Sequence, residues 1–167
     1  MSKNLQPSEL DALDRRILSV LQENGRITNQ QLAERVHLSP SACSRRVARL
    51  EEGGVISGYV ALLTPSAAGR GTTVFVQVTL ARQNQDDMAA FEAAVAECPD
   101  VMECYLMSGE SDYVVKVAVR DLQDYERVHT QYLSRMPGVA RIHSSFTLRT
   151  VKKATAFELE RRAGAGR

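Results

Sequence analysis

The sequence contains no tryptophan, only 5% aromatic residues and almost no net charge. Its 21 lysines and arginines nearly balance its 20 aspartates and glutamates. This balance excludes a uniformly basic protein that coats nucleic acid, so any affinity for DNA must come from a local cluster of cations. The hydrophobic content of 44% is normal for a globular protein with an ordinary core.

Cysteine and long apolar runs are also scarce. Cys43, Cys98 and Cys104 form no CxxC pair, so neither a zinc site nor a disulfide framework is predicted. Three reduced, buried thiols in a cytoplasmic protein are the expectation. No apolar segment is long enough for a membrane span or a signal peptide, which favours a soluble protein with no membrane partner. We expect no cofactor, no metal and no catalytic residue.

Three short helices are predicted near the N-terminus. Apolar spacing indicates a helix over residues 11–24, which Asn24-Gly25 would end. Thr28 followed by Gln31 resembles a capping box at the start of a second helix. Ser39 is a good N-cap with Pro40 at the first helical position, and a third helix would run to Glu52. This arrangement predicts a helix-turn-helix.

The third helix has one inward and one outward face. Cys43, Val47 and Leu50 share a narrow sector that must face the core. Short hydroxyls and arginines occupy the opposite side, with Arg46 at the border. Hydroxyls suit phosphate oxygens, and arginine can bind a phosphate or the O6 and N7 atoms of guanine. The alternative is a solvated basic face; cap, proline and spacing together favour DNA contact. The predicted DNA-binding residues are Ser39, Ser41, Ser44, Arg45, Arg46 and Arg49.

The remaining chain predicts a second module. Val55 to Leu63 is predicted as an extended hinge strand of a first domain, residues 1–63, and residues 64–71 as a linker. From Thr72 the pattern follows the order β-α-β-β-α-β, which is typical of a ferredoxin-like fold, over residues 72–157. Residues 158–167 are expected to form a flexible tail. The predicted fold class is therefore α+β.

The predicted strand over residues 113–119 is apolar on both faces. A ferredoxin-like unit carries helices on one sheet face only, so an apolar opposite face needs a partner. We therefore expect two copies to pair through their sheets as a homodimer. A two-fold dimer would present its two recognition helices to half-sites about one helical turn of DNA, or a multiple of it, apart.

The loop from Met107 to Asp112 is a second candidate site. Gly109 permits close approach of a ligand, free N–H groups would hold a carboxylate, and Asp112 would pair with an ammonium group. An ordinary hairpin turn, in which Asp112 accepts hydrogen bonds from local backbone groups, explains the same residues equally well.

Four segments together resemble the Lrp/AsnC (feast/famine) transcription factors over about residues 10–157. They are LDALDRRILSVLQENGRIT, LAERVHLSPSACSRRVARLEEGGVISGYVALL, MSGESDYVVKV and MPGVARIHSSFTL. The resemblance implies a winged helix-turn-helix, a hinge strand, and a ferredoxin-like C-terminal (RAM-type) domain that dimerises and binds small effectors, usually amino acids. It also implies that Arg141–Phe146 face the loop from a neighbouring subunit, with assembly to a tetramer or octamer. The expected effector-binding residues are Met107, Ser108, Gly109, Asp112, Tyr113, His143, Ser144 and Ser145.

Three alternatives remain. His129, His143, Asp112 and the cysteines would serve an enzyme, but no motif places them together. An architectural DNA protein would need no effector, but the near-zero net charge argues against heavy nonspecific coating. A redox sensor would use Cys98 and Cys104.

Overall fold

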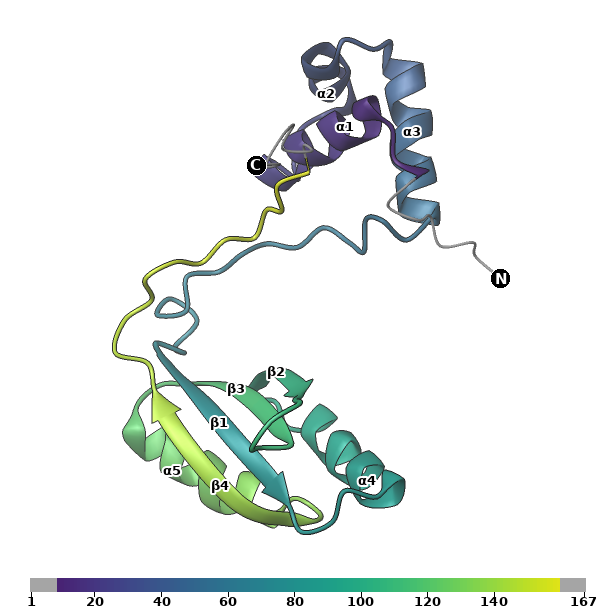
Figure 1. The fold of residues 1–167 in the computed structure, drawn as a ribbon. Coiled ribbons are helices and arrows are strands. Elements are labelled where there is room, and N and C mark those ends of the chain that lie inside the picture. The colour runs from purple at the N-terminus through teal and green to yellow at the C-terminus, as the bar shows by residue number, and fades with distance from the viewer. Residues whose placement is uncertain (1–8, 160–167) are drawn as a thin grey trace, which may run out of the picture. The chain divides into compact units, whose positions relative to one another are not determined.

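The computed structural model describes residues 9–159, which form two compact units. Of these residues, a helical unit contains those up to Ala61 and again from Lys152, and a sheet unit contains Leu62–Val151. Figure 1 shows the ribbon of both units. The segment from Lys152 to Leu159 therefore groups with the helices by its contacts.

The helical unit is a bundle of three short helices: α1 (Ala12–Glu23), α2 (Asn29–Val36) and α3 (Pro40–Glu52). Each begins at a side-chain cap, because Asp11, Thr28 and Ser39 accept backbone N–H bonds from the first turn. Asp11 and Thr28 are completed as capping boxes by Asp14 and Gln31. The core consists of Ile17, Leu18, Leu32, Ala33, Val36, Cys43 and Leu50.

The helix ends differ in detail from the prediction. Gly25 does not adopt a positive φ, and α1 ends instead at Asn24 in an extended conformation. His37 takes the left-handed conformation in the turn between α2 and α3, with its N–H bonded to the Ala33 carbonyl. Gly54, with φ 69°, follows α3, and the N–H of Val55 returns to the Leu50 carbonyl.

The predicted hinge strand over Val55–Leu63 does not form. In the described part of the chain this segment has no strand partner. Several of its apolar side chains are exposed. Alternating apolar residues favour an extended backbone, but a strand also needs a neighbour for its N–H and C=O groups. Residues 64–70 then make a compact turn, in which the Arg70 N–H bonds to the Pro65 carbonyl at 2.7 Å.

The sheet unit confirms the predicted β-α-β-β-α-β order. Its elements are β1 (Thr72–Leu80), α4 (Gln85–Ala96), β2 (Val101–Leu106), β3 (Tyr113–Val119), α5 (Leu122–Gln131), a 3₁₀ turn (Leu133–Arg135) and β4 (Val139–Phe146). The four antiparallel strands lie in the order β2-β3-β1-β4. Both helices cover the same face of this sheet (Figure 1), over a core rich in valine. Neither helix of the sheet unit lies on the opposite face, which is called the open face below.

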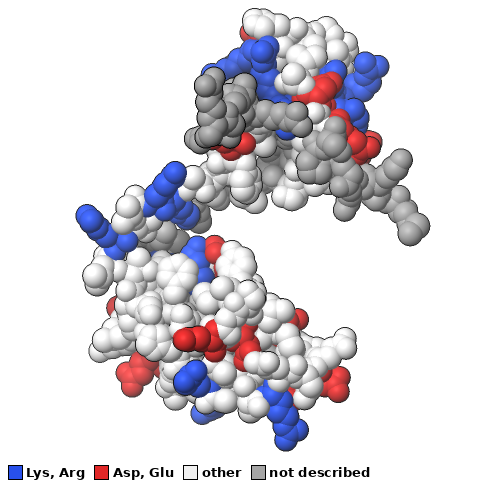
Figure 2. All heavy atoms as spheres, viewed as in Figure 1, with Lys and Arg blue, Asp and Glu red and all other residues white. Residues whose placement is uncertain are grey.

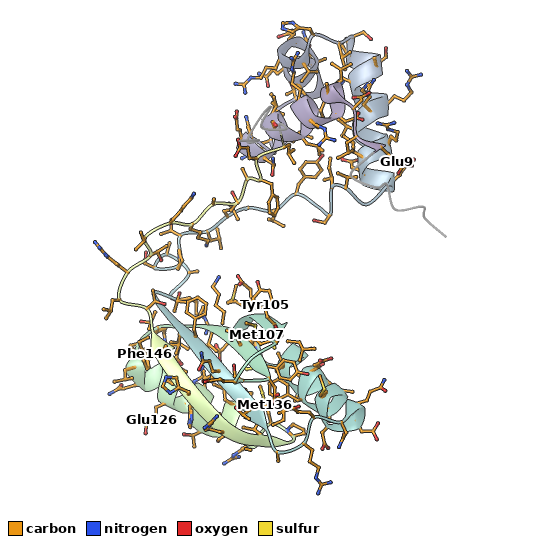
Figure 3. The ribbon with its side chains drawn as sticks, in the orientation of Figure 1. Glu9, Tyr105, Met107, Glu126, Met136 and Phe146 are labelled. Atoms are coloured by element: carbon orange, nitrogen blue, oxygen red, sulfur yellow. The ribbon has the colours of Figure 1, made fainter. Side chains whose placement is uncertain are left out.

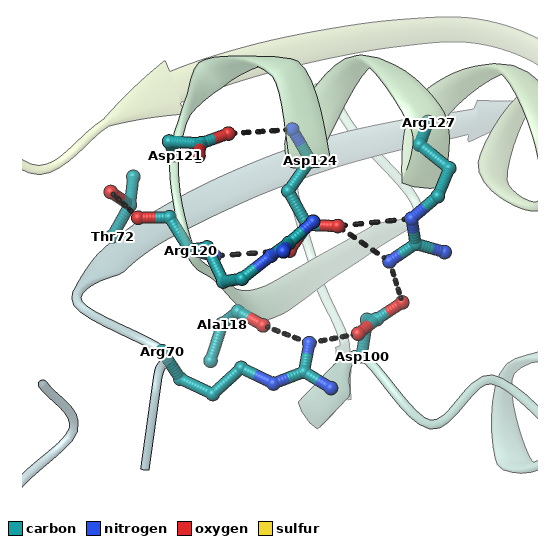
Figure 4. A network of polar contacts seen from close by, with 8 residues as sticks. All are labelled: Arg70, Thr72, Asp100, Ala118, Arg120, Asp121, Asp124 and Arg127. Carbon is teal, nitrogen blue, oxygen red and sulfur yellow. Dashed lines mark hydrogen bonds and ion pairs between the residues drawn. The ribbon is translucent and has the colours of Figure 1, made fainter. Parts of the chain in front are cut away.

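A buried polar cluster fixes the start of β1 to α5 (Figure 4). Asp100, directly before β2, accepts hydrogen bonds from Arg70 and Arg127, and Arg127 also binds Asp124 at 2.9 Å. Arg70 additionally donates to the Ala118 carbonyl at 3.1 Å. The two carboxylates are almost fully buried, so these pairs supply the partners that a buried charge requires.

Candidate functional site

Helix α3 presents its polar face as the spacing predicts. Cys43 and Leu50 are buried, whereas Ser41, Ser44, Arg45 and Arg49 are exposed. The orientation of α3 against α2 is fixed in part by the Asn29 side chain, which donates to the Pro40 carbonyl at 2.8 Å. A hydroxyl-bearing N-terminal turn followed by outward arginines is the arrangement that a DNA-reading helix needs.

The predicted serines divide between a cap and a free surface. The Ser39 hydroxyl accepts the Ala42 N–H at 3.3 Å and lies 3.3 Å from the Ser41 hydroxyl. Ser39 is thus occupied mainly as a helix cap. Ser41 and Ser44 lie on the exposed face beside Arg45, where their hydroxyls are accessible to phosphate oxygens.

Of the predicted arginines, two are paired with carboxylates of the helical unit and one is not. Arg46 donates to Asp11 and Asp14, each at 2.7 Å, and Arg49 donates to the other carboxylate oxygen of Asp14. Arg45 is exposed, and within the described residues it has no hydrogen bond or ion pair. Arg45 is therefore the one arginine of this helix whose whole guanidinium is available to a ligand.

The Asp11 and Arg46 pair also changes the acidity of both groups. Burial works to raise the pKa of the Asp11 carboxyl, but hydrogen bonds from the Asp14 N–H and from Arg46 outweigh it and lower the pKa. The pKa of Arg46 is raised by its hydrogen bonds to Asp11 and Asp14. Both side chains are therefore charged at neutral pH and attract one another.

Sequence reasoning missed Asp14. The residue lies three and four positions before Ile17 and Leu18, and therefore on the apolar face of α1. A carboxylate at a core-facing position could have predicted an ion pair, because a buried charge needs a cationic partner. Figure 2 shows both basic and acidic side chains on the helical unit, and both kinds among largely uncharged residues on the visible face of the sheet unit.

In the sheet unit, the Asp112 side chain is occupied by hydrogen bonds to residues at and after the end of β1. Its carboxylate accepts the Leu80 N–H and the Gln83 side-chain amide, each at 2.7 Å. The Asp112 backbone joins Val78 to Met107 through hydrogen bonds of 2.9 and 2.8 Å. These contacts match the hairpin-turn interpretation of Asp112. Met107, Ser108 and Gly109 are exposed, and a Cβ atom at Gly109 would meet nothing within 4 Å.

A pocket of about 340 Å³ lies beside this loop, on the helix-free face of the sheet. Its lining comes from β1, from the loop and from β4: Gln77, Thr79, Glu110, Ser111, Arg141, Ile142 and His143. The loop and β4 thus meet within one chain. The pocket combines a guanidinium, a carboxylate and an imidazole, a set that suits a small zwitterion. Gln77 and Thr79 were not predicted, although their alternation with Val76 and Val78 places them on the open face.

The structure separates the remaining predicted effector residues between the two sheet faces. His143 and Ser145 pair with Gln77 and Phe75 on the open face. Tyr113 is buried under α4, where its hydroxyl donates to Glu92 at 2.7 Å. Ser144 lies on the covered face as well, in hydrogen-bond contact with the Tyr125 hydroxyl.

The open sheet face is mixed in character. Phe75 and Tyr105 are 42% and 54% exposed, and Val114 lies between their strands. Lys116 and Glu103, 2.6 Å apart, form an ion pair on the same face. Figure 3 shows Tyr105 and Met107 at the β2 side of the sheet; Phe146 on β4 lies instead on the covered face, against Tyr125.

The cysteines do not form a reactive centre in the described residues. Cys43 and Cys98 are buried and Cys104 is half-buried, all as free thiols. Burial raises the pKa of the Cys43 and Cys104 thiols, which keeps them protonated and poorly nucleophilic. Within residues 9–159 no group of histidine, cysteine and carboxylate side chains is arranged to hold a metal, and no helix is long and apolar enough to cross a bilayer.

Two family models match the chain. The model described as the Lrp/AsnC ligand binding domain matches residues 73–157. The model described as a winged helix-turn-helix, DNA-binding, matches residues 10–57. The boundary between the two matches falls in the connecting segment that precedes β1.

Curated proteins and solved structures agree with these matches. The leucine-responsive regulatory protein of Salmonella typhimurium is 40% identical over 161 residues, covering 96% of this chain and 98% of that protein. An uncharacterised HTH-type transcriptional regulator of Sinorhizobium fredii is 48% identical over 116 residues, 70% of this chain and 91% of that one. A transcriptional regulator from Neisseria meningitidis, solved as a complex with L-Met, matches with a TM-score of 0.85 and 39% identity over 90% of this chain and 97% of its own. An AsnC family regulator from Agrobacterium tumefaciens has the same TM-score and coverages at 35% identity.

Proposed function

The chain belongs to the Lrp/AsnC family of DNA-binding transcriptional regulators with a ligand-binding domain, and from that premise we propose a specific mode of action. The protein reads DNA with α3 as a homodimer in the cytoplasm, and a free amino acid held in the pocket on the open sheet face modulates this binding. The relatives that it matches are transcriptional regulators and not enzymes.

The observation that carries the amino-acid proposal is the lining of the 340 Å³ pocket. Arg141 supplies a guanidinium for an α-carboxylate and Glu110 supplies a carboxylate for an α-ammonium group. Asp112, which the sequence favoured for the ammonium group, has both oxygens engaged by Leu80 and Gln83. Its role in this proposal is to hold the loop that carries Glu110. The L-Met complex of the Neisseria meningitidis relative supports an amino acid as the ligand class.

The dimer proposal rests on the open face of the sheet. Phe75, Tyr105 and Val114 are apolar or aromatic groups on a face that neither helix of the sheet unit covers. A second copy of the same face would bury them. A ligand bound on that face, at the edge of such an interface, would favour one assembly, dimer, tetramer or octamer, over another.

Calorimetry of the full chain against the proteinogenic amino acids, beginning with L-Met and L-Leu, tests the effector proposal. Arg141→Met and Glu110→Gln should each abolish the binding heat, whereas Arg135→Met, a change at an exposed arginine after α5, should leave it unchanged. A ligand at roughly 100 times its Kd should also stabilise the protein by about 2.7 kcal/mol. Equal binding by wild type and both pocket variants would place the effector elsewhere.

Gel shifts on a duplex enriched from a random-sequence pool with the wild-type protein test the α3 proposal. Arg45→Ala should weaken binding by about 1–3 kcal/mol if the arginine reads a guanine. Arg16→Ala, at an exposed arginine on α1, serves as the control and should change the affinity little. If Arg45→Ala binds the duplex as tightly as wild type, α3 is not the recognition helix.

A further inference from the structure

Asp14 is a buried carboxylate that two arginines of the proposed recognition helix share. One oxygen accepts Arg46 at 2.7 Å, and the other accepts Arg49 and the Asp11 N–H, the latter at 3.2 Å. The side chain is fully buried, while those of Arg46 and Arg49 are 26% and 47% exposed. The guanidinium groups therefore lie between the core of the helical unit and its surface.

This geometry divides the cations of α3 into two kinds. Arg45 projects with its charge uncompensated by any described residue, whereas Arg46 and Arg49 have theirs balanced by Asp14 and, for Arg46, also by Asp11. Nonspecific affinity for DNA comes mainly from cations that neutralise phosphates and release counterions. A guanidinium already paired with a carboxylate releases fewer counterions when it approaches a phosphate.

We propose that Asp14 is a specificity-determining residue, which withholds Arg46 and Arg49 from indiscriminate phosphate binding and fixes the direction of their remaining donors. The proposal rests on the assignment of α3 as the recognition helix. Arginine has five donors, and Arg49 uses one of its terminal nitrogens for Asp14. The other donors of Arg49 stay at the exposed surface in a fixed orientation, so less side-chain entropy is lost when they meet a base edge.

Asp14→Asn is the matched substitution because the amide has the same shape without the charge. Its nitrogen would present donors to a guanidinium, which has no acceptor, so at least one arginine loses its partner. The released arginine can then reach phosphates. We expect tighter binding to a scrambled duplex and a steeper fall of log affinity with log salt, by about 0.9 for each further phosphate that the protein neutralises. We expect the ratio of specific to nonspecific affinity to fall about tenfold or more, within the range that one bidentate contact discriminates.

The experiment measures salt-dependent binding of the full chain to the enriched duplex and to its scrambled counterpart. Asp11→Asn is the control, since it leaves Asp14 and both of its arginine contacts in place, and it should shift the slope much less. A purely structural role for Asp14 would weaken binding to both duplexes without steepening the slope. That outcome, or an unchanged ratio, overturns the proposal.

Arg46→Gln provides a second, independent test if Asp14→Asn does not fold. Because Arg46 is already paired, its removal should leave the salt slope of wild type unchanged, while Arg45→Gln should flatten the slope by about 0.9. Equal flattening by the two variants would show that Arg46 binds phosphate and would overturn the role of Asp14. If Arg45→Gln binds both duplexes with the same affinity and salt slope as wild type, the assignment of α3 as the recognition helix fails instead.

Discussion

The side chain of Gln22 pairs with the backbone of Phe157 as a neighbouring strand would. Its carbonyl accepts the Phe157 N–H at 2.7 Å, and its amide donates to the Phe157 carbonyl at 3.1 Å. Leu159 follows and packs against the helical core, so the chain after β4 returns to complete the helical unit. The ligand-binding sheet is thus joined to the helices both through the segment before β1 and through the segment after β4.

Gln22→Ala should loosen this return segment. Loss of the two hydrogen bonds should lower the stability of the helical unit by about 1 kcal/mol, the usual net contribution of such bonds. Amide hydrogen exchange of α1 and of Phe157 gives the measurement, with faster exchange expected in both. Gln30→Ala is the control, because the Gln30 side chain makes only a 3.4 Å contact to Glu34 on the same helix. Unchanged exchange at Phe157 would mean that the Gln22 pairing contributes nothing.

Most of the fold was readable because its signals are local. The caps Thr28 and Ser39 and the alternation along β1 each predict their element from neighbouring residues, and the structure confirms them. The hinge strand over Val55–Leu63 was wrong because a strand depends on a partner that local alternation does not reveal. The return of residues 152–159 to α1 was missed for the same reason, since its hydrogen bonds span 135 residues of sequence.

For α3 and for the pocket, the sequence predicted the local features but not the contacts between distant elements. Helical spacing placed Arg45 outward correctly, but it treated Arg46 and Arg49 as free donors because the carboxylate that binds them lies on another helix. The loop from Met107 was proposed from its glycine and polar residues, and two of its residues, Glu110 and Ser111, line the pocket. The contribution of β1 and β4 to the pocket depends on sheet pairing, which puts Gln77 beside His143, and composition alone does not reveal that pairing.

Asp112 should prove to be a structural residue. Asp112→Ala leaves the N–H of the buried residue Leu80 without a partner, so the sheet unit should lose about 1–3 kcal/mol of stability. Asp112→Asn keeps an oxygen for that N–H and should cost less. Urea unfolding of both variants measures the effect, and Glu110→Gln, an exposed neighbour in the same loop, is the control for stability. If Asp112→Ala unfolds like wild type but fails to bind any amino acid, Asp112 is a ligand contact after all.

The cluster around Asp124 should make the sheet unit acid-sensitive. The Arg120 N–H and the Arg127 side chain lower the pKa of Asp124 to about 2. The folded state holds this pKa below its unfolded value of about 3.9. The charged carboxylate therefore adds its full stability at a pH above that value, and the contribution is lost as the pH falls toward about 2. Asp124→Asn should therefore be less stable than wild type at neutral pH and differ little near about pH 2.

Acid titration of unfolding by urea, followed by circular dichroism, gives this comparison. Asp121→Asn is the matched control, because asparagine caps a helix as well as aspartate does and the Asp124 N–H keeps its acceptor. The control should follow the wild-type curve closely. A constant difference between Asp124→Asn and wild type at every pH would assign the effect to lost packing instead of lost charge.

Phe75→Glu should separate the proposed dimer into folded monomers. Phe75 lies on the inner strand β1 and is 42% exposed on the face that neither helix of the sheet unit covers. A carboxylate there would be buried against its own copy across a two-fold interface, where like charges repel and desolvation adds to the cost. Leu122→Glu is the control, since Leu122 on α5 is also exposed but lies on the helix-covered side of the sheet unit.

Sedimentation velocity of wild type and both variants measures the assembly. We expect a dimer or larger assembly for wild type and Leu122→Glu, and a smaller species with unchanged circular dichroism for Phe75→Glu. Equal assembly of all three would exclude the open sheet face as the interface.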